Sequence, residues 1–329
     1  MCAPHRGDSR TAMIVSRRIR RVAVGTLVCF VWSATPARAQ DMEPKTYAAA
    51  PVGGNFVVTS YNWSSGSVLF DPTLPFTDVH AGVQALVVAT GHTFGLFGKL
   101  GRVSVALPYA WADVTGKIQE QAAATTRSGL ADARVKLSVN LRGNPAMLPR
   151  EFVKAPRRTI VGASIAVSAP AGQYYDMKLI NLGTNRWAFK PEVGVAWPKG
   201  RWDVDAYAGV SFFTANPDFY PGGSTRTEER LAAIQGHVSY TLRRGLWVAA
   251  DGTWYSGGRA RVNGGDPSLG VNSSRLGVTV SMPVGVRYSL KVSYSSGVWA
   301  ARTGSDFNTL AVAWQALWLS PRFAGSLTP

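Results

Sequence analysis

Residues 186–212 read RWAFKPEVGVAWPKGRWDVDAYAGVSF, and apolar and polar side chains alternate along both halves of this stretch. In the first half the large apolar side chains share one parity, at positions 187, 189, 193, 195 and 197, and the charged ones stand on the other. A period of two indicates a β-strand with two different faces. Only residues 198–201 separate the halves, which leaves room for a tight turn. The stretch therefore predicts a β-hairpin with one apolar and one charged face.

The same unit recurs along the chain, with short Gly- and Pro-containing links alternating with longer polar ones. Among the longer links, 116–128, 215–228 and 257–273 are predicted to be loops, and the link 142–157 can hold a helical turn. An even strand count with short turns at one end and long loops at the other is typical of an outer-membrane antiparallel β-barrel. We predict about twelve strands, at 54–65, 79–94, 102–115, 130–141, 158–170, 186–197, 201–214, 229–242, 245–256, 274–282, 288–298 and 307–318.

A soluble β-sandwich would also alternate, but its outward parity would be polar. Here one parity carries Trp, Phe, Val, Leu and Ala, which favours contact with lipid. Tryptophans near strand ends suit the aromatic girdles of a membrane barrel, although a sandwich core could also use them. The last strand alternates up to Trp318, as the assembly signal of such barrels does, and Pro108 predicts a bulge or kink in mid-strand.

The N-terminus has the parts of a secretory signal peptide: a cluster of arginines at 17–21, an apolar run over 22–34 and the small pair Ala37 and Ala39. The apolar run is too short to span a bilayer. We predict cleavage before Gln40, with Met13 as an alternative start to Met1. The domains are then a signal peptide at 1–39, an N-terminal periplasmic segment at 40–53, the barrel at 54–318 and a C-terminal tail at 319–329.

The signal peptide holds seven arginines, Asp8 and both cysteines, so its removal lowers the net charge from +16 to +10 and leaves no thiol. The exported chain therefore has no disulfide and no cysteine metal site. Its bases are spread along the chain without a cluster, which argues against nucleic-acid binding. No spacing indicates a metal site or a cofactor. The expected partners are outer-membrane lipid, the barrel assembly machinery and a small-molecule solute.

The inward parity of the predicted strands collects charged side chains of both signs. Opposed charges of this kind are expected to cross-link the wall around a narrow bore, because a twelve-stranded barrel has a backbone diameter of roughly 24 Å. Its surplus of bases predicts a weak preference for anions. The candidate pore-lining residues are Arg134, Lys136, Arg158, Arg186, Lys190, Glu192, Asp203, Asp205, His237, Asp251, Arg275 and Lys291, with Asp132 as a further acid.

Two parts of this set also suggest chemical sites. His237 could serve as the base of an outer-membrane lipid-modifying enzyme. However, its parity places it on the inward polar side, and the sequence does not require any serine to lie next to it. Asp203 and Asp205 could bind a cation, or could pair with neighbouring bases in the lumen. The sequence favours a His237 without a catalytic role, and it favours pairing of Asp203 and Asp205 with lumen bases over cation binding.

Several motifs resemble those of a family of outer-membrane transporters associated with the meta-pathway of phenol degradation. The resemblance implies an outer-membrane barrel that moves aromatic or other small organic compounds, and it supplies no catalytic residue. We therefore predict a passive channel, with a plugged structural or ligand-binding barrel as the alternative and a lipid-modifying enzyme as a second. The motifs are Leu69-Phe70-Asp71-Pro72, Ile160-Val161-Gly162-Ala163-Ser164, Ala169-Pro170-Ala171-Gly172-Gln173-Tyr174, Asn181-Leu182-Gly183-Thr184-Asn185-Arg186-Trp187, Phe189-Lys190-Pro191-Glu192 and Thr303-Gly304-Ser305-Asp306-Phe307.

Overall fold

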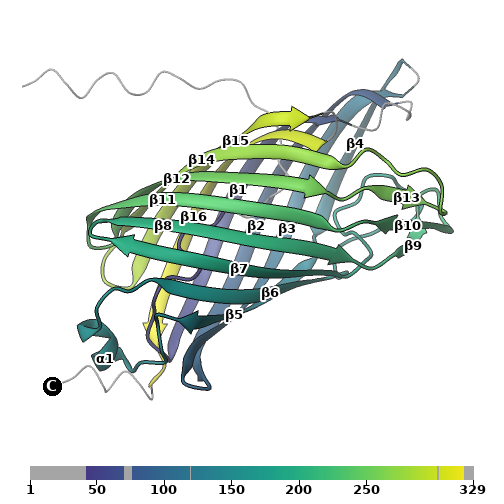
Figure 1. The fold of residues 1–329 in the computed structure, drawn as a ribbon. Coiled ribbons are helices and arrows are strands. Elements are labelled where there is room, and N and C mark those ends of the chain that lie inside the picture. The colour runs from purple at the N-terminus through teal and green to yellow at the C-terminus, as the bar shows by residue number, and fades with distance from the viewer. Residues whose placement is uncertain (1–41, 70–75, 119, 302–303, 322–329) are drawn as a thin grey trace, which may run out of the picture. The chain divides into compact units, whose positions relative to one another are not determined.

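The chain folds into a closed antiparallel β-barrel with twelve strand positions in its wall, which confirms the predicted fold class (Figure 1). The computed structural model describes residues 42–69, 76–118, 120–301 and 304–321. The signal peptide predicted at 1–39 and most of the C-terminal tail lie outside these residues. The wall consists of β1 (Gly54–Leu69), β2 (Phe76–Leu96), β3 (Lys99–Ile118), β4 (Gln121–Leu130), β5 (Ala133–Arg142), β6 (Ile160–Ala169), β7 (Ala188–Lys199), β8 (Trp202–Phe213), β11 (Leu231–Arg243), β12 (Leu246–Gly257), β14 (Val271–Pro283), β15 (Tyr288–Ala301) and β16 (Gly304–Leu319).

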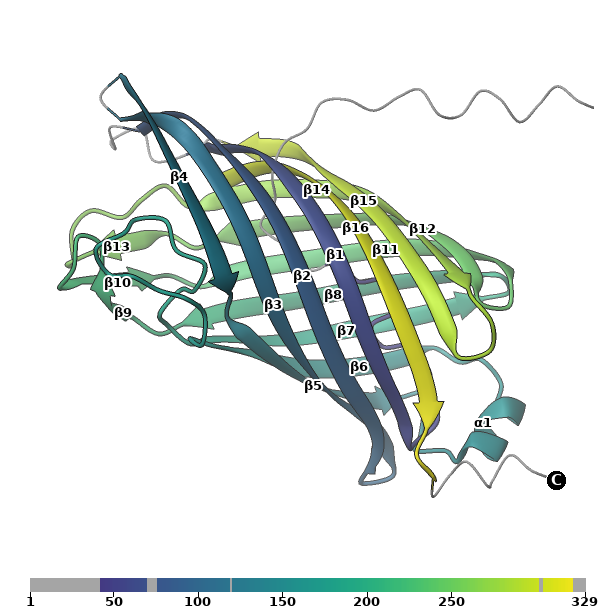
Figure 2. The same cartoon turned by 180° about the vertical axis from the view of Figure 1, so that it is seen from behind.

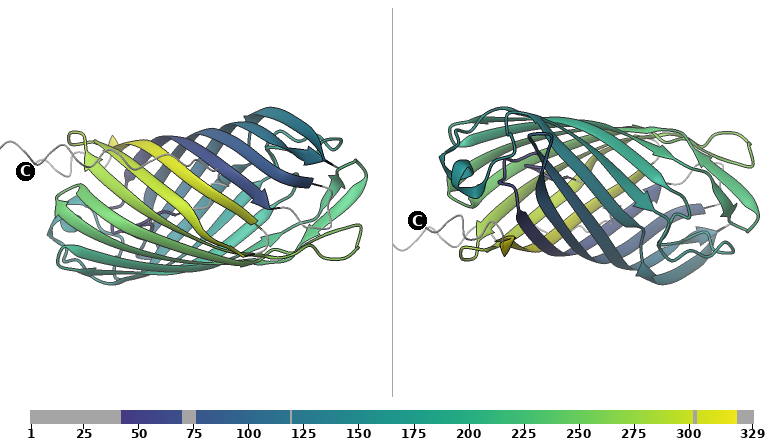
Figure 3. Two further views of the ribbon diagram at one scale, coloured as in Figure 1. Left: turned by 90° about the horizontal axis from the view of Figure 1, so that it is seen from above. Right: turned by 90° about the horizontal axis from the view of Figure 1, so that it is seen from below.

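The barrel closes where its first strand pairs with its last. β1 pairs with β2 on one side and with β16 on the other, from Gly54 opposite Leu319 to Leu69 opposite Gly304. The other neighbours in the wall follow the order of the chain, except that β3 pairs with β5 as well as with β4; Figures 2 and 3 show the barrel from further sides. The hairpin read from residues 186–212 is β7 and β8, with Lys199 opposite Trp202.

One position in the wall is shared by two strands. β5 pairs with the first part of β3 and β4 with the second part, so the two follow each other along one line. The break lies opposite Pro108, which has no N–H to donate to a neighbouring strand. Pro108 itself remains paired with Val87, so the predicted irregularity falls in the partner strand and not in β3. Beside β4 the loop 170–187 continues the wall, where the Gln173 N–H donates to the Leu130 carbonyl.

The long-loop end contains more strand than the sequence predicted. β4 occupies most of the link expected over 116–128, and the links at 215–228 and 257–273 contain β9 (Asn216–Phe219), β10 (Ser224–Glu228) and β13 (Ala260–Val262). These three form a small sheet of their own (Figure 1). Those loop predictions were wrong because strands beyond the lipid need no apolar face, so their composition resembles that of a loop.

The short-turn end holds four brief links, at 97–98, 200–201, 244–245 and 284–287, together with Gly54 and Leu319. The β2–β3 turn consists of Phe97 and Gly98 alone, both with positive φ (48° and 75°), which is the type I′ geometry that suits the twist of a hairpin. The single longer link here contains the expected helical turn, α1 (Pro149–Lys154).

The outer wall is apolar and the inner wall is polar. Leu107, Trp111, Val193, Ile234 and Leu276 are exposed on the outside. Within the described residues, no helix is long and apolar enough to cross a membrane. Since lipid offers no hydrogen bonds to the backbone, a closed sheet with this exterior is the form in which strands cross a bilayer. The protein is therefore an outer-membrane β-barrel, as predicted.

The lipid contact of β7 can be tested at Val193, which lies near the middle of the strand and is 59% exposed. Val193→Arg should lower the free energy of unfolding by about 2–4 kcal/mol, because a charge would face hydrocarbon. Denaturant titration of the protein in lipid vesicles measures this. Val193→Leu is the matched control and should stay within about 0.5 kcal/mol of the native value. Equal stability of the two variants would show that Val193 does not face lipid.

Candidate functional site

The interior of the barrel is a polar lumen. Among the described residues, buried polar and charged side chains outnumber buried hydrophobic ones, which is the reverse of a soluble core. Register places Arg134, Lys136, Lys190 and Lys291 on the same inner face, partly exposed. The predicted residues that are buried there are Arg186, Glu192, Asp203, Asp205, His237, Asp251 and Arg275.

Two predicted residues lie at the margins of this set. Arg158 is exposed in the link before β6, because the strand begins at Ile160 and not at 158 as predicted. Asp132 lies at the break between β4 and β5, where its carboxylate accepts hydrogen bonds from the Gly172 and Thr184 N–H groups at 3.0 and 2.9 Å. Asp132 thus fastens the loop 170–187 to the wall.

Residues 42–53 lie inside the lumen, where the sequence predicted a periplasmic segment. We call them the lumen segment. Lys45 contacts the Asp203 carboxylate at 2.5 Å, and its N–H donates to Asp205 at 3.3 Å. The Thr46 N–H donates to the hydroxyl of Tyr207 at 3.1 Å. These contacts join the segment to β8 over more than 150 residues of sequence.

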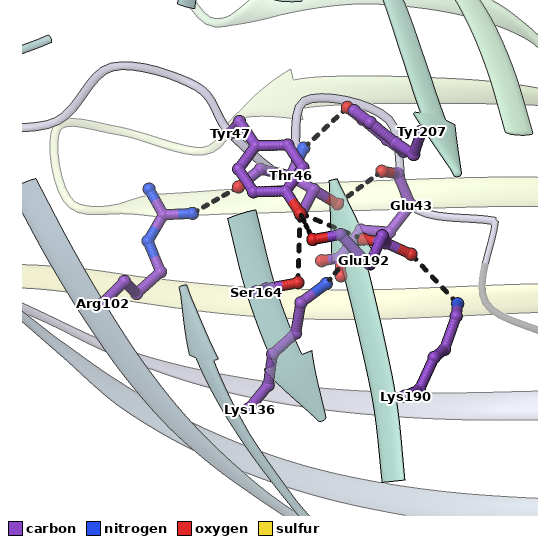
Figure 4. A network of polar contacts seen from close by, with 9 residues as sticks. All are labelled: Glu43, Thr46, Tyr47, Arg102, Lys136, Ser164, Lys190, Glu192 and Tyr207. Carbon is purple, nitrogen blue, oxygen red and sulfur yellow. Dashed lines mark hydrogen bonds and ion pairs between the residues drawn. The ribbon is translucent and has the colours of Figure 1, made fainter. Parts of the chain in front are cut away.

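Tyr47 is the best-anchored side chain of the lumen segment, 1% exposed among β6, β7 and β8 (Figure 4). Its hydroxyl lies 3.0 Å from the Ser164 hydroxyl and 3.3 Å from a Glu192 carboxylate oxygen. Burial raises the pKa of the Tyr47 hydroxyl above its ordinary value, so the group keeps its proton and donates. The ring meets Tyr207 edge-on, with 5.3 Å between centroids.

Two facing glycines make room for the Tyr47 ring. Gly162 and Gly194 are opposite each other on β6 and β7. A Cβ atom at either position would come within 2.2 or 2.4 Å of the Tyr47 ring. Only glycine permits so close an approach of a ring to the backbone of the wall.

Arg102 is a lumen residue that the sequence analysis missed. It donates to the Thr46 carbonyl at 2.7 Å and to the Ala48 carbonyl at 3.2 Å, and so holds the lumen segment from β3 (Figure 4). Register places it opposite Ser138, which is buried. The parity of β3 could therefore have identified Arg102, whereas Lys45 and Tyr47 precede the first strand and show no period.

Opposed charges pair across the lumen in three layers. At the long-loop end Glu228 forms ion pairs with Arg186 at 2.8 Å and with Arg226 at 3.0 Å. In the middle Glu192 receives Lys190 at 3.0 Å and Lys136 at 3.5 Å (Figure 4). At the short-turn end Asp203 receives Lys45 and Arg157. In the part of the chain that the structure describes, no three His, Cys, Asp or Glu side chains gather as metal ligands.

His237 belongs to a hydrogen-bonded chain in the inner wall. Its Nδ1 lies 2.7 Å from Asp251, whose other carboxylate oxygen accepts the Thr279 hydroxyl at 2.6 Å. The imidazole is 1% exposed and lies against the Tyr207 ring. The imidazole faces the lumen, whereas a lipid-modifying enzyme would need its histidine on the lipid-facing side.

Two cavities lie at opposite ends of the lumen. The mouth cavity, at the long-loop end, has a volume of about 300 Å³ and is lined by Val79, Val114, Gly116, Ala123, Met177, Leu179, Ile180 and Tyr220 together with Lys117, Arg127 and Lys178. The periplasmic cavity has a volume of about 320 Å³ and is lined by Lys45, Ala48, Asn144, Phe152, Arg157, Arg158, Asp203 and Asp205 among others. Lys45 and Ala48 place the lumen segment directly beside the second cavity.

Residues 51–311 match the profile of a family described as "Putative MetA-pathway of phenol degradation". The chain belongs to this family. The family resemblance read from the sequence motifs is thereby confirmed. No curated protein sequence shows significant similarity to this member of the phenol-degradation family.

Comparison with solved structures found similar outer-membrane proteins for this phenol-degradation family member. The COG4313 outer membrane channel from Pseudomonas putida F1 is 19% identical, with a TM-score of 0.71 over 84% of this chain and all of that one. The beta domain of the Bordetella autotransporter BrkA is 12% identical, with a TM-score of 0.48 over 81% of this chain and all of that one. The CymD monoaromatic hydrocarbon channel is 7% identical, with a TM-score of 0.38 over 82% of this chain and 90% of that one. The first of these confirms the barrel fold.

The niche for Tyr47 can be tested by filling it. Gly162→Val should displace the lumen segment, because over-packing of this kind costs about 1–3 kcal/mol. In protein that also carries Ala48→Cys, we expect maleimide to label the thiol about tenfold faster. Gly236→Val is the matched control, since a Cβ atom there meets nothing within 4 Å. Equal labelling rates in the two variants would contradict the role of the niche.

Proposed function

We propose that this protein is an outer-membrane channel for the passive passage of small organic solutes, with the lumen segment as its narrowest part. The observation that carries the proposal is the placement of the two cavities, one at each end of a charged lumen, with the lumen segment beside the inner one. A solute that occupies the mouth cavity would have to pass Tyr47 and the Glu192 layer before it reached the periplasmic cavity.

The mouth cavity indicates the class of solute. Most of its lining is apolar, from Val79 and Val114 to Met177 and Tyr220. Arg127 and Lys178 add positive charge, whereas Lys117 is paired with Asp78 at 2.7 Å. An apolar pocket with a few charged groups binds small organic molecules and fixes their orientation. The cavity is therefore suited to a compact apolar or aromatic body that bears an anionic group. The family's association with phenol degradation supports the same class.

The charges of the lumen support a weak preference for anions. Lys136 and Lys190 both approach the single carboxylate of Glu192, so this layer holds two bases and one acid. Arg102, Arg275 and Lys291 add further positive charge on the inner face. Inside a low-dielectric wall such a surplus attracts anions and repels cations.

We also propose that the barrel performs no catalysis. The site weighed for an enzyme was His237, and its Nδ1 is engaged by Asp251 within the inner wall. Among the described residues, the structure records no serine within hydrogen-bonding distance of that imidazole. Assembly through the barrel assembly machinery and contact with outer-membrane lipid belong to the same proposal.

A plugged barrel without transport is the second candidate, and the lumen segment is the observation that favours it. Lys45, Thr46 and Tyr47 together form hydrogen bonds or ion pairs with five strands of the wall, which is firm anchorage for so short a stretch. The two candidates differ in what removal of the segment does to passive flux and in whether the native protein conducts at all.

Deletion of residues 42–50 distinguishes the two candidates. We expect the native protein to conduct ions in planar bilayers, and the deletion to raise the conductance about twofold or more because it clears part of a narrow bore. Unboiled gel electrophoresis checks that the barrel still forms. A native protein that never conducts, with a deletion variant that does, would establish the plugged barrel instead.

Ion preference tests the middle layer separately. Replacement of Lys136 and Lys190 together by glutamine leaves Glu192 without its two bases, so the reversal potential under a salt gradient should move from the anion side to the cation side. The matched control removes two bases from the outer loops, Arg230→Gln with Arg259→Gln, and should move it much less. If both double variants retain the native reversal potential, ions do not pass the Glu192 layer.

A further inference from the structure

The turns at the short-turn end carry an excess of exposed bases. The described residues there include one exposed acid, Glu151, and its carboxylate accepts the Leu148 N–H at the start of α1. We call the exposed bases the periplasmic rim: Lys99, Arg142, Arg150, Lys154, Arg157, Arg158, Lys199, Arg201, Arg243, Arg244 and Arg287. Eight of these eleven are arginines, the side chain whose planar fork fits a phosphate group.

The opposite end of the barrel has no such excess. Its described links, at 120, 170–187, 214–230 and 258–270, hold six bases and six acids. Two of those bases, Arg186 and Arg226, pair with Glu228. The positive charge of the exported chain is therefore concentrated at one end, and neither solubility nor the lumen requires that asymmetry.

The periplasmic rim surrounds the barrel. Each of the five links at this end contributes to it, from the β2–β3 turn to the β14–β15 turn (Figures 2 and 3). A protein partner that docks on one face would meet only some of these bases. A ring of charge around a membrane barrel matches the lipids that surround it.

Exposed aromatic side chains place the rim at the level of lipid headgroups. Trp197 and Trp202 flank the β7–β8 turn, and Tyr288 stacks on Trp314 beside the β14–β15 turn. Tryptophan and tyrosine prefer the boundary between hydrocarbon and headgroups. Lys199, Arg201 and Arg287 lie within two residues of these anchors along the chain, so their long side chains can reach phosphate oxygens while their stems stay near lipid.

We propose that the periplasmic rim binds the phosphodiester headgroups of anionic phospholipids, of the phosphatidylglycerol type, in the inner leaflet of the outer membrane. A base close to an anionic lipid surface contributes roughly fivefold to binding. Lys99, Arg150 and Arg157 interact within the protein, and Arg158 lines the periplasmic cavity, yet the other seven bases still greatly outnumber Glu151. The proposal is independent of whether the lumen is open, because it concerns the outer edge of the wall.

The test compares two lipids at the surface of the folded barrel. The native protein is reconstituted in phosphatidylcholine vesicles with a trace of spin-labelled phosphatidylglycerol or spin-labelled phosphatidylcholine, and electron spin resonance measures the fraction of each label that the protein immobilises. We expect the relative association constant to favour phosphatidylglycerol about threefold or more. The preference should approach one at about 1 M salt, where charges are screened within about 3 Å.

Matched variants locate the preference. Arg201→Gln, Arg243→Gln and Arg244→Gln together remove three bases from two turns of the rim and should lower the preference about twofold or more. Arg230→Gln, Arg259→Gln and Arg261→Gln together remove three bases from the outer loops and should leave it unchanged. Unboiled gel electrophoresis confirms that both variants fold.

Three outcomes would overturn the proposal. Equal association of the two lipids with the native protein would show that the rim does not select anionic headgroups. An equal decrease in both triple variants would show that only overall charge matters. Salt-sensitive binding of polyglutamate at the rim without any lipid preference would assign it to an acidic protein partner.

Discussion

Backbone hydrogen bonding in hydrocarbon is the constraint on which the rest of this structure depends. Lipid cannot pair with an N–H or a carbonyl, so every strand needs two neighbours, and the first must meet the last. β1 and β16 meet along their whole length, from Gly54 opposite Leu319 to Leu69 opposite Gly304. Once the sheet is closed, the pleat sends one parity into lipid and the other into the lumen. Apolar residues must take the first parity, so the polar residues collect inside.

The buried polar side chains of the interior need ion-pair and hydrogen-bond partners, and these come from other lumen residues. Glu192 and Asp203 each form ion pairs with two bases, and His237, Asp251 and Thr279 form a hydrogen-bonded chain. The lumen segment supplies further donors through its backbone and through Lys45. Its insertion resembles the packing of a small ligand into a preformed site, since Gly162 and Gly194 leave a gap that the Tyr47 ring fills.

What the sequence could predict was local, and what it could not predict depended on distant contacts. Alternation and short links are properties of neighbouring residues, so β7, β8 and their turn follow from residues 186–212 directly. The partners of Tyr47, by contrast, lie 117 and 145 residues away, and residues 42–53 have no period that would indicate them. Arg158 and Arg102 show how accurately residue parity predicts the lumen lining. β6 begins two residues later than predicted, so Arg158 lies outside the wall. Arg102 has inward parity but was not identified as a lumen residue. β4 was missed because strands outside lipid have no apolar face.

The covalent attachment of the lumen segment to β1 affects the equilibrium between its bound and released states. The segment's last residues, Pro51, Val52 and Gly53, lead into β1, and the Gly53 N–H donates to the Thr93 carbonyl. When the contacts of Lys45 and Tyr47 with the wall break, the segment therefore cannot diffuse away. Its effective concentration at its own binding site stays in the range of millimolar or above. A solute that binds at that site must compete with a covalently attached segment, whose effective concentration does not fall when the protein is diluted. The occupancy of the lumen is then an intramolecular equilibrium, identical at every protein abundance and adjustable only by changes within the chain or by the solute itself.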